Sequence, residues 1–245
     1  MKQLLLFGLI FLLAACGTPE LSTPAPTPEA IHVNYPAALK PWADQLARCA
    51  TDHPLTGLYF NQYSKLETDI RENDIELVFG EPPQGLPPYS LTQIGWEQVV
   101  VITNIENETS QLSIGELQSI FSGQTSGWQN DSGELIQVWV LPLGDPTRTF
   151  FDRAVIPSQS LASEAMLAPD PAAMLEAISD ESNAIGYLPH SILDSGDPTL
   201  VSAVNIIQLD DTLDEALRQP VIAITRSEPT GLMRELLVCL SAPTP

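Results

Sequence analysis

Short apolar runs alternate with stretches of helical periodicity from residue 31 onward. The apolar runs at 31–33, 58–60 and 75–79 are short and sparsely polar, as strands buried on both faces are. The intervening segments 37–50 and 64–72 have the spacing expected of helices. Strands that alternate with helices usually pair in parallel, so the pattern predicts an α/β fold built on a parallel sheet.

The same alternation continues through the rest of the chain. The stretch from about 31 to 240 has a length that suits one domain or two lobes of common origin. Further strands are predicted at 99–102, 138–141, 184–188 and 221–224, and further helices at 147–155, 171–179 and 230–240, with a shorter one ending near 122.

The N-terminus has the pattern of an export signal. Lys2 precedes an apolar run at 4–13, which is shorter than the roughly 20 residues of a membrane-spanning helix. The run ends in Leu-Ala-Ala before Cys16, and this resembles the lipobox of bacterial lipoproteins. We therefore predict a lipoprotein signal peptide at 1–15 and acylation of Cys16. The alternative is an ordinary signal peptide with a chance cysteine.

The segment that follows is poor in residues that could be buried. Residues 16–29 contain mainly Thr, Pro, Ser, Ala and Glu, which is typical of a solvated, Pro-stiffened tether. The predicted location is therefore the cell membrane, with the folded part held by the lipid and facing the periplasm or the exterior.

The charge of the chain excludes some partners. It has 31 acidic residues against 10 basic ones, a formal net charge of −21. Such a surface repels nucleic acid and anionic lipid headgroups, so we predict no nucleic-acid partner.

Two cysteines remain after Cys16, in a compartment that permits disulfides. Cys49 lies in the first predicted helix and Cys239 in the last. They either pair or lie buried separately as thiols. On the chain-entropy model a bond closing so long a loop would stabilise the fold by about 4–5 kcal/mol.

Catalytic chemistry has little support in the sequence. His32, His53 and His190 are scattered, no serine lies in a Gly-x-Ser-x-Gly turn, and no metal-ligand spacing occurs. The acidic pairs 210–211 and 214–215 have the pattern of a solvated helix start. We predict no enzyme activity, no metal and no cofactor.

Several fragments resemble, in order and spacing, the substrate-binding proteins of ABC importers with the type II periplasmic-binding fold, in particular the phosphate-binding branch. The fragments are Asn34-Tyr35-Pro36-Ala37, Val78-Phe79-Gly80-Glu81, Ile120-Phe121-Ser122-Gly123 with Trp128, Gly144-Asp145-Pro146-Thr147-Arg148-Thr149-Phe150, and Ala184-Ile185-Gly186-Tyr187. The resemblance covers nearly all of the mature chain.

The resemblance implies two α/β lobes that face each other across a ligand-binding cleft and are joined by two crossing strands at the hinge. The first lobe would comprise 30–103 plus 189–245, and the second 104–188. The first and last helices would then belong to one lobe, which favours a disulfide between Cys49 and Cys239.

Clefts of this kind bind anions with backbone N–H groups at helix N-termini, aided by hydroxyl groups. Three turns precede predicted helices: Asn34-Tyr35, Ser64-Lys65 and Thr147-Arg148-Thr149. Arg148 could also hold an oxyanion with two parallel hydrogen bonds. The alternative for each turn is simple helix capping or a solvated charge. The candidate ligand-binding residues are Asn34, Tyr35, Ser64, Lys65, Thr147, Arg148 and Thr149, together with Glu81 and Asp145, which stand at family binding positions.

The same turns depart from the family pattern. Asp145 and Pro146 stand where the family has Ser and Gly, so a hydroxyl donor becomes a carboxylate and an N–H is lost. Glu81 replaces the Asp that accepts the phosphate proton. A dianion beside Glu81 and Asp145 would need compensation from Arg148 and Lys65, so phosphate itself is a doubtful ligand.

The prediction is a lipid-anchored, monomeric solute-binding protein that serves an ABC permease and takes a small polar solute or an oxyanion. The alternative is a surface lipoprotein that keeps the fold as a sensor or interaction module without transport.

Overall fold

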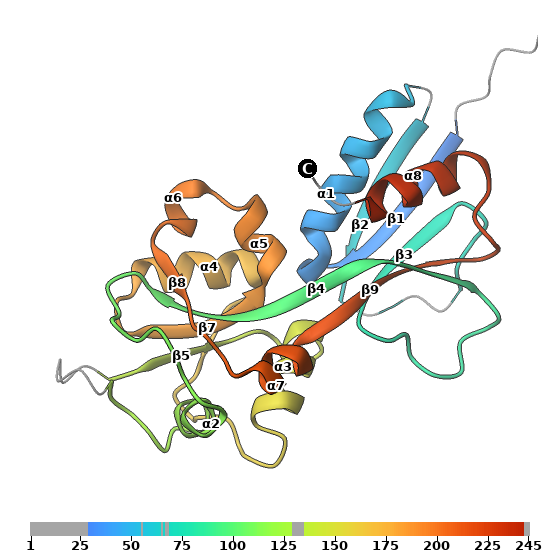
Figure 1. Cartoon of the computed structure of the whole chain (residues 1–245). Helices are drawn as coiled ribbons and strands as arrows, with labels where there is room; N and C mark the ends of the chain where they lie inside the picture. The colour runs from blue at the N-terminus through green and yellow to red at the C-terminus, as the bar shows by residue number, and fades with distance from the viewer. Residues whose placement is uncertain (1–28, 55, 65, 67–68, 129–134, 243–245) are drawn as a thin grey trace, which may run out of the picture.

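The computed structural model describes residues 29–242 except 55, 65, 67–68 and 129–134 (Figure 1). The predictions for the signal peptide, for Cys16 and for the tether up to residue 28 lie outside the described residues. Where the chain is described, no helix has the length and apolar character needed to cross a bilayer.

The elements alternate between strands and helices over most of the chain, as the sequence predicts. They are β1 (Glu29–Pro36), α1 (Lys40–Cys49), β2 (Thr56–Tyr63), β3 (Asp74–Phe79), β4 (Ser90–Asn104), α2 (Ile114–Phe121), β5 (Gln137–Val140), α3 (Pro146–Val155), β6 (Met166–Leu167), α4 (Pro171–Asp180), β7 (Ala184–Pro189), α5 (His190–Ser195), α6 (Pro198–Val201), β8 (Val204–Ile206), α7 (Asp211–Ala216), β9 (Arg218–Thr225) and α8 (Gly231–Ser241), with short 3-10 turns at Ala37–Leu39 and Ala50–Asp52. The exception is β2, β3 and β4, which follow one another without an assigned helix in the described residues between them.

The strands form one continuous curled path in the order β2-β1-β3-β9-β4-β7-β5-β6, with β8 beside β4. The pairs of β1 with β2 and β3, and of β5 with β6 and β7, are parallel, as the alternation predicts. The pairs that involve β4 or β9 are antiparallel. The α/β prediction is therefore confirmed, with a mixed rather than a purely parallel sheet.

β4 joins two lobes (Figure 1). Its first part pairs with β9, whereas residues Val99–Thr103 pair with β7. We call β1–β3 with α1 and α8 lobe 1, and β5–β7 with α2, α3 and α4 lobe 2. This is the two-lobed arrangement with crossing strands that the resemblance implies. The boundaries at 103/104 and 188/189 stay a prediction.

The predicted helix at 64–72 is not found in the described residues of that segment. Here a turn forms, because the Asp74 carboxylate accepts the Arg71 N–H at 3.0 Å. Ile70 is buried against Val78 and Ile224, so an irregular segment rather than a helix covers this part of the sheet. Tertiary packing of one apolar residue has overridden a weak local helix signal.

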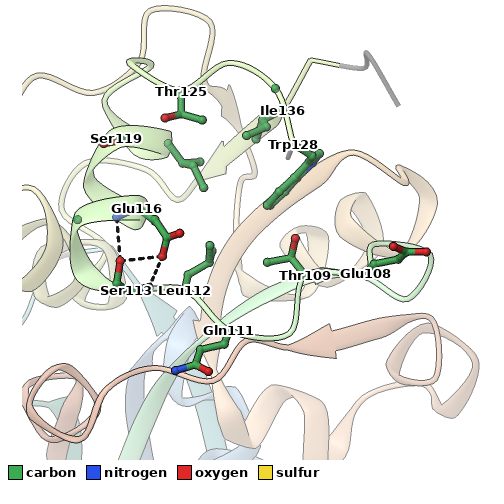
Figure 2. A pocket seen from close by; sticks show the side chains of 13 residues that line it. Glu108, Thr109, Gln111, Leu112, Ser113, Glu116, Ser119, Thr125, Trp128 and Ile136 are labelled. Carbon is green, nitrogen blue, oxygen red and sulfur yellow. Dashed lines mark hydrogen bonds between the residues drawn. The ribbon is translucent and has the colours of Figure 1, made fainter. Parts of the chain in front are cut away.

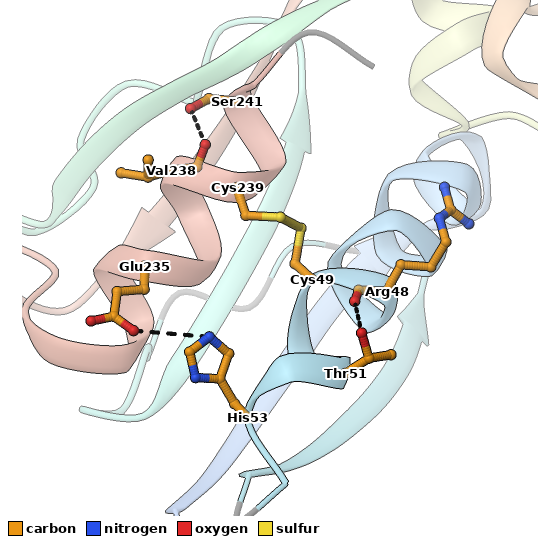
Figure 3. Close-up of a disulfide and its surroundings, with 8 residues drawn as sticks. All are labelled: Arg48, Cys49, Thr51, His53, Glu235, Val238, Cys239 and Ser241. Carbon is orange, nitrogen blue, oxygen red and sulfur yellow. Dashed lines mark hydrogen bonds and ion pairs between the residues drawn. A yellow bond between two sulfur atoms is a disulfide. The ribbon is translucent and has the colours of Figure 1, made fainter. Parts of the chain in front are cut away.

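The disulfide prediction is confirmed. Cys49 at the end of α1 is bonded to Cys239 in α8, with the two Cα atoms 6.0 Å apart (Figure 3). The bond joins the first and last helices of the fold within lobe 1 and spans a sequence separation of 190 residues.

Candidate ligand-binding cleft

A cleft of about 750 Å³ lies between the lobes. On the lobe 1 side it is formed where β2 and β3 end, and on the lobe 2 side by the turn before α3 and by α3 itself. Ligands of open α/β sheets bind at these carboxyl ends of the strands. Its lining is Pro36, Ala37, Gln62, Tyr63, Ser64, Leu66, Val78, Phe79, Glu81 and Pro83 from lobe 1, and Pro142, Leu143, Gly144, Asp145, Pro146, Thr149, Phe150, Arg153 and Pro169 from lobe 2.

Four of the predicted ligand residues line this cleft: Ser64, Glu81, Asp145 and Thr149. Ser64 and Glu81 come from lobe 1, and Asp145 and Thr149 from lobe 2, so the structure brings together side chains from distant parts of the sequence. Lys65 lies outside the described residues.

Asn34 and Tyr35 do not belong to the described cleft lining. Side chains of a strand alternate between its faces, and β1 turns Tyr35 into the core, where it meets Phe60 edge-on. Asn34 faces the opposite side of the sheet, where it donates a hydrogen bond to Glu76 and lines a separate polar hollow of about 210 Å³.

Arg148 also points elsewhere. Its Nε donates to Asp152 at 3.2 Å and its Nη1 to the Leu141 carbonyl oxygen at 2.7 Å. Arg148 and Asp152 are four residues apart, a spacing at which side chains of one helix meet. This spacing is the sequence signal that could have shown that Arg148 has a partner within α3. The proposed role of Arg148 as an oxyanion clamp has no support in this geometry.

The N-terminus of α3 is occupied by the protein's own carboxylate. Asp145 Oδ1 accepts hydrogen bonds from the N–H groups of Thr147, at 2.8 Å, and Arg148, at 3.4 Å. Pro146 contributes no N–H, and the Thr147 side chain is fully buried. The hydroxyl group of Thr149 donates to the Asp145 carbonyl oxygen at 3.0 Å. The donors that the sequence assigned to an oxyanion thus cap the helix instead.

Burial raises the pKa of the Asp145 carboxyl, and the negative charge of Asp170 raises it further. Hydrogen bonds from Thr147 and from the Arg148 N–H partly offset these effects. The cleft therefore presents a partly desolvated carboxyl at the point where an anion-binding site would present donors.

Several lining residues were not predicted. Tyr63 donates from its hydroxyl group to the Leu77 carbonyl oxygen at 2.8 Å, and its pKa is raised by burial and by the Glu76 charge. Arg153 places its guanidinium group 5.4 Å from the centroid of the Phe150 ring, on the lobe 2 side. No motif indicated them, because their place depends on how the lobes meet.

Phe150 makes direct contact between the lobes. Its ring meets Phe79 of lobe 1 edge-on, with centroids 5.1 Å apart. A Cβ atom built on Gly80 would lie only 2.1 Å from Phe150 Cζ, and Gly80 has a φ of +88°. Only glycine meets both demands without strain. The aromatic contact therefore fills part of the cleft.

The sequence matches no protein-family model and no curated protein. Solved structures do match. A phosphate-bound protein from Clostridium perfringens, described as a candidate substrate-binding protein of a phosphate ABC transporter, superposes with a TM-score of 0.70, at 15% identity over 86% of this chain and 93% of that one. An ABC-type phosphate transport receptor from Vibrio cholerae gives 0.60, at 15% identity over 87% and 94%.

The regulatory domain of OxyR from Pseudomonas aeruginosa, in its reduced form, is also similar, with a TM-score of 0.58 at 12% identity over 88% of this chain and 99% of that one. These likenesses show the fold: the chain has the type II periplasmic-binding fold, and it resembles the phosphate branch. The same fold serves binding proteins and regulatory domains, so function has to be argued from the cleft.

Proposed function

We propose that the chain is a lipid-anchored, extracytoplasmic solute-binding protein and the receptor of an ABC importer. The observation that carries the proposal is the cleft of about 750 Å³, which is lined by polar side chains from both lobes. A solute held between Ser64 and Gln62 on one side and Asp145 on the other would stabilise the closed arrangement of the lobes, as binding-induced closure requires.

The solute is a small polar molecule without a free oxyanion. The described lining contains the carboxyl groups of Glu81 and Asp145 and a single basic residue, Arg153. The N–H groups at the start of α3 already bind Asp145. A phosphate dianion would face repulsion from these carboxylates and would lack the donors that normally compensate it.

A thermal-shift screen on the whole protein tests this proposal. A neutral solute that binds should raise Tm, since a ligand at 100 times its Kd stabilises by about 2.7 kcal/mol. Sugars and other neutral polar solutes form one arm, and phosphate and sulfate the other. A shift with phosphate in the unmodified protein would contradict the ligand class, and no shift with any solute would contradict the receptor role.

The matched variant is Asp145→Ser, which restores the hydroxyl group of the phosphate binders and removes the carboxylate charge that lies on the N–H groups of Thr147 and Arg148. We expect phosphate to gain affinity in this variant relative to the unmodified protein. Asp210→Ser makes the same exchange at the N-cap of α7, where Asp210 accepts the Leu213 N–H at 3.0 Å, and serves as the control.

The anchor rests on the sequence. Replacing Cys16 by Ser should release the protein from membranes into the soluble fraction. Continued membrane attachment of the Cys16→Ser protein would contradict acylation at this position.

One observation favours the second candidate function, a sensor or interaction module without transport. Phe150 contacts Phe79 and Gly80 across the lobes, so a side chain of the protein supplies a contact that a ligand would otherwise make. The thermal-shift screen and the Phe150→Ala variant separate the two. A receptor should bind a solute, and more tightly once the ring is removed, whereas a ligand-independent module should bind none in either form.

A further inference from the structure

A second cavity, of about 570 Å³ and shown in Figure 2, is formed by residues of lobe 2. It is an open pocket bordered by the loop after β4, the first turns of α2 and the segment around Trp128, and it shares no lining residue with the cleft. Cavities of this size hold small organic molecules. Its lining is Glu108, Thr109, Gln111, Leu112, Ser113, Gly115, Glu116, Ser119, Ile120, Thr125, Gly127, Trp128 and Ile136.

The aromatic wall of this cavity is fixed in place. Trp128 Nε1 donates to the Asn183 carbonyl oxygen at 3.1 Å, and Asn183 Nδ2 donates to the Leu135 carbonyl oxygen at 2.6 Å. Gly127 and Leu135 also form an isolated antiparallel bridge. With its only polar atom bonded to the backbone, the indole ring of Trp128 lines the cavity as an apolar π surface (Figure 2).

The opposite side of the cavity is acidic. Glu116 stands across the space from Trp128 in Figure 2, and its carboxylate accepts hydrogen bonds from the N–H and the hydroxyl group of Ser113 at 2.8 and 2.7 Å. These bonds lower the pKa of Glu116 and keep it ionised. Glu108 contributes a second carboxylate from the other end of the lining, beyond Thr109 in Figure 2.

The described lining contains no Lys, Arg or His, and its remaining residues are apolar or carry neutral hydroxyl and amide groups. An anion would meet two carboxylates with no positive charge to offset them. A small metal ion is also a poor fit, because no group of three or more His, Cys, Asp or Glu side chains able to hold one occurs among the described residues.

We propose that this cavity binds an organic cation of the methylated ammonium class. The positive charge of such a cation is attracted to the carboxylates of Glu108 and Glu116, and its methyl groups pack on Leu112 and on the face of Trp128. Trp is the aromatic side chain that attracts a cation most strongly, and the attraction grows when the cation is poorly hydrated. The formal net charge of −21 further raises the local concentration of cations.

The test is a titration of the whole protein, labelled with ¹⁵N at its 4 tryptophans, with tetramethylammonium chloride. Sodium chloride at equal ionic strength and glucose are parallel arms. The indole N–H signals are assigned with single Trp→Phe variants. We expect a saturable shift of the Trp128 signal with tetramethylammonium alone, while the signal of Trp96, which is exposed near Arg218, stays in place.

Two variants define the site. Trp128→Leu should weaken tetramethylammonium binding by about five- to tenfold in calorimetry, through loss of the cation–π contact. The double variant Glu108→Gln/Glu116→Gln should weaken it by about two- to fivefold. Gln at position 116 keeps the capping box, so this variant preserves α2 even where Trp128→Leu perturbs folding. Glu228→Gln, an exposed acid elsewhere, should have no effect.

The outcomes that overturn the proposal are distinct. An equal shift with sodium chloride would mean general charge screening. A saturable shift with glucose and none with tetramethylammonium would assign the cavity to a sugar. Binding that is unchanged in both the Trp128→Leu and the double Gln variant would place the cation elsewhere.

Discussion

Lobe 1 and lobe 2 are each stabilised internally, but by different kinds of interaction. Lobe 1 has a disulfide between α1 and α8. Lobe 2 has a buried aromatic cluster in which the Phe151 and Tyr187 rings stack with centroids 3.9 Å apart, and Phe121 packs on Phe151 at 4.6 Å.

The difference follows from how the chain enters each lobe. Lobe 1 is made from the two ends of the chain, so its assembly must close a loop that contains all of lobe 2, at a large cost in chain entropy. A covalent bond reduces that cost by restricting the unfolded chain. The elements of lobe 2 follow one another between residues 114 and 189, so local packing suffices.

The largest effect is expected from the double variant Cys49→Ser/Cys239→Ser. Opening a loop of this length should lower the free energy of unfolding by about 4–5 kcal/mol, measured by urea denaturation. Limited proteolysis should then cut lobe 1 first. The control is His53→Ala, which removes the half-exposed pair of His53 with Glu235, 3.9 Å apart beside the disulfide (Figure 3), and leaves the disulfide in place. Equal stability of the double variant and the unmodified protein would refute the role given to the bond.

In lobe 2, Phe151→Ala should lower the free energy of unfolding by about 3–5 kcal/mol, because it leaves a cavity between Phe121 and Tyr187. Proteolysis should now begin in lobe 2 instead of lobe 1. Phe60→Ala is the control, since the Phe60 side chain is 39% exposed and its loss leaves no enclosed cavity. If lobe 1 still opened first in the Phe151→Ala protein, the contrast between the lobes would be wrong.

A smaller effect is expected at the start of α2. Ser113 caps this helix in a reciprocal capping box with Glu116. Ser113→Ala should cost about 1 kcal/mol in thermal or urea unfolding, because it leaves a helix N–H unpaired. Ser110→Ala in the preceding loop should cost less. Equal losses in both variants would show that the cap is not what stabilises this end of lobe 2.

The smallest effect concerns pH. The pKa of Asp145 is raised on folding, mainly by burial, so the folded state holds this proton more tightly than the unfolded state. The resulting stabilisation is fully present below the unfolded pKa and is lost as pH rises through the folded pKa. The unmodified protein should therefore lose stability relative to Asp145→Asn as pH increases over this range, as urea denaturation at a series of pH values would reveal.

Asp197 provides the control of opposite sign. Its pKa is lowered by hydrogen bonds from Thr199, so its contribution is present above the unfolded pKa and is lost as pH falls through the folded pKa. The difference in free energy of unfolding between the unmodified protein and Asp197→Asn should therefore change with pH in the opposite direction to the difference for Asp145→Asn. The same direction in both variants would contradict the assignment at Asp145.

The cleft was only partly predictable. The turn Asp145-Pro146-Thr147 indicated a departure from anion binding, because a carboxylate replaces a hydroxyl donor and an N–H is lost. The structure adds that the Asp145 carboxylate takes the helix donors for itself. Two features depend on distant segments and could not be predicted from the local sequence. One is which face of β1 carries Tyr35 and which carries Asn34, and the other is the contact of Phe150 with Gly80.

The sequence by itself determined most of the order of strands and helices, because burial patterns, caps and turns depend on residues a few positions apart. Capping and helical spacing are local in the same way: Ser113 with Glu116, and Arg148 with Asp152. Tertiary structure decided which side chains meet, as it did for the disulfide between Cys49 and Cys239. The irregular structure of the 64–72 segment and the linings of the cleft and of the second cavity were decided only by packing. Each depends on surfaces that come together after the chain has folded.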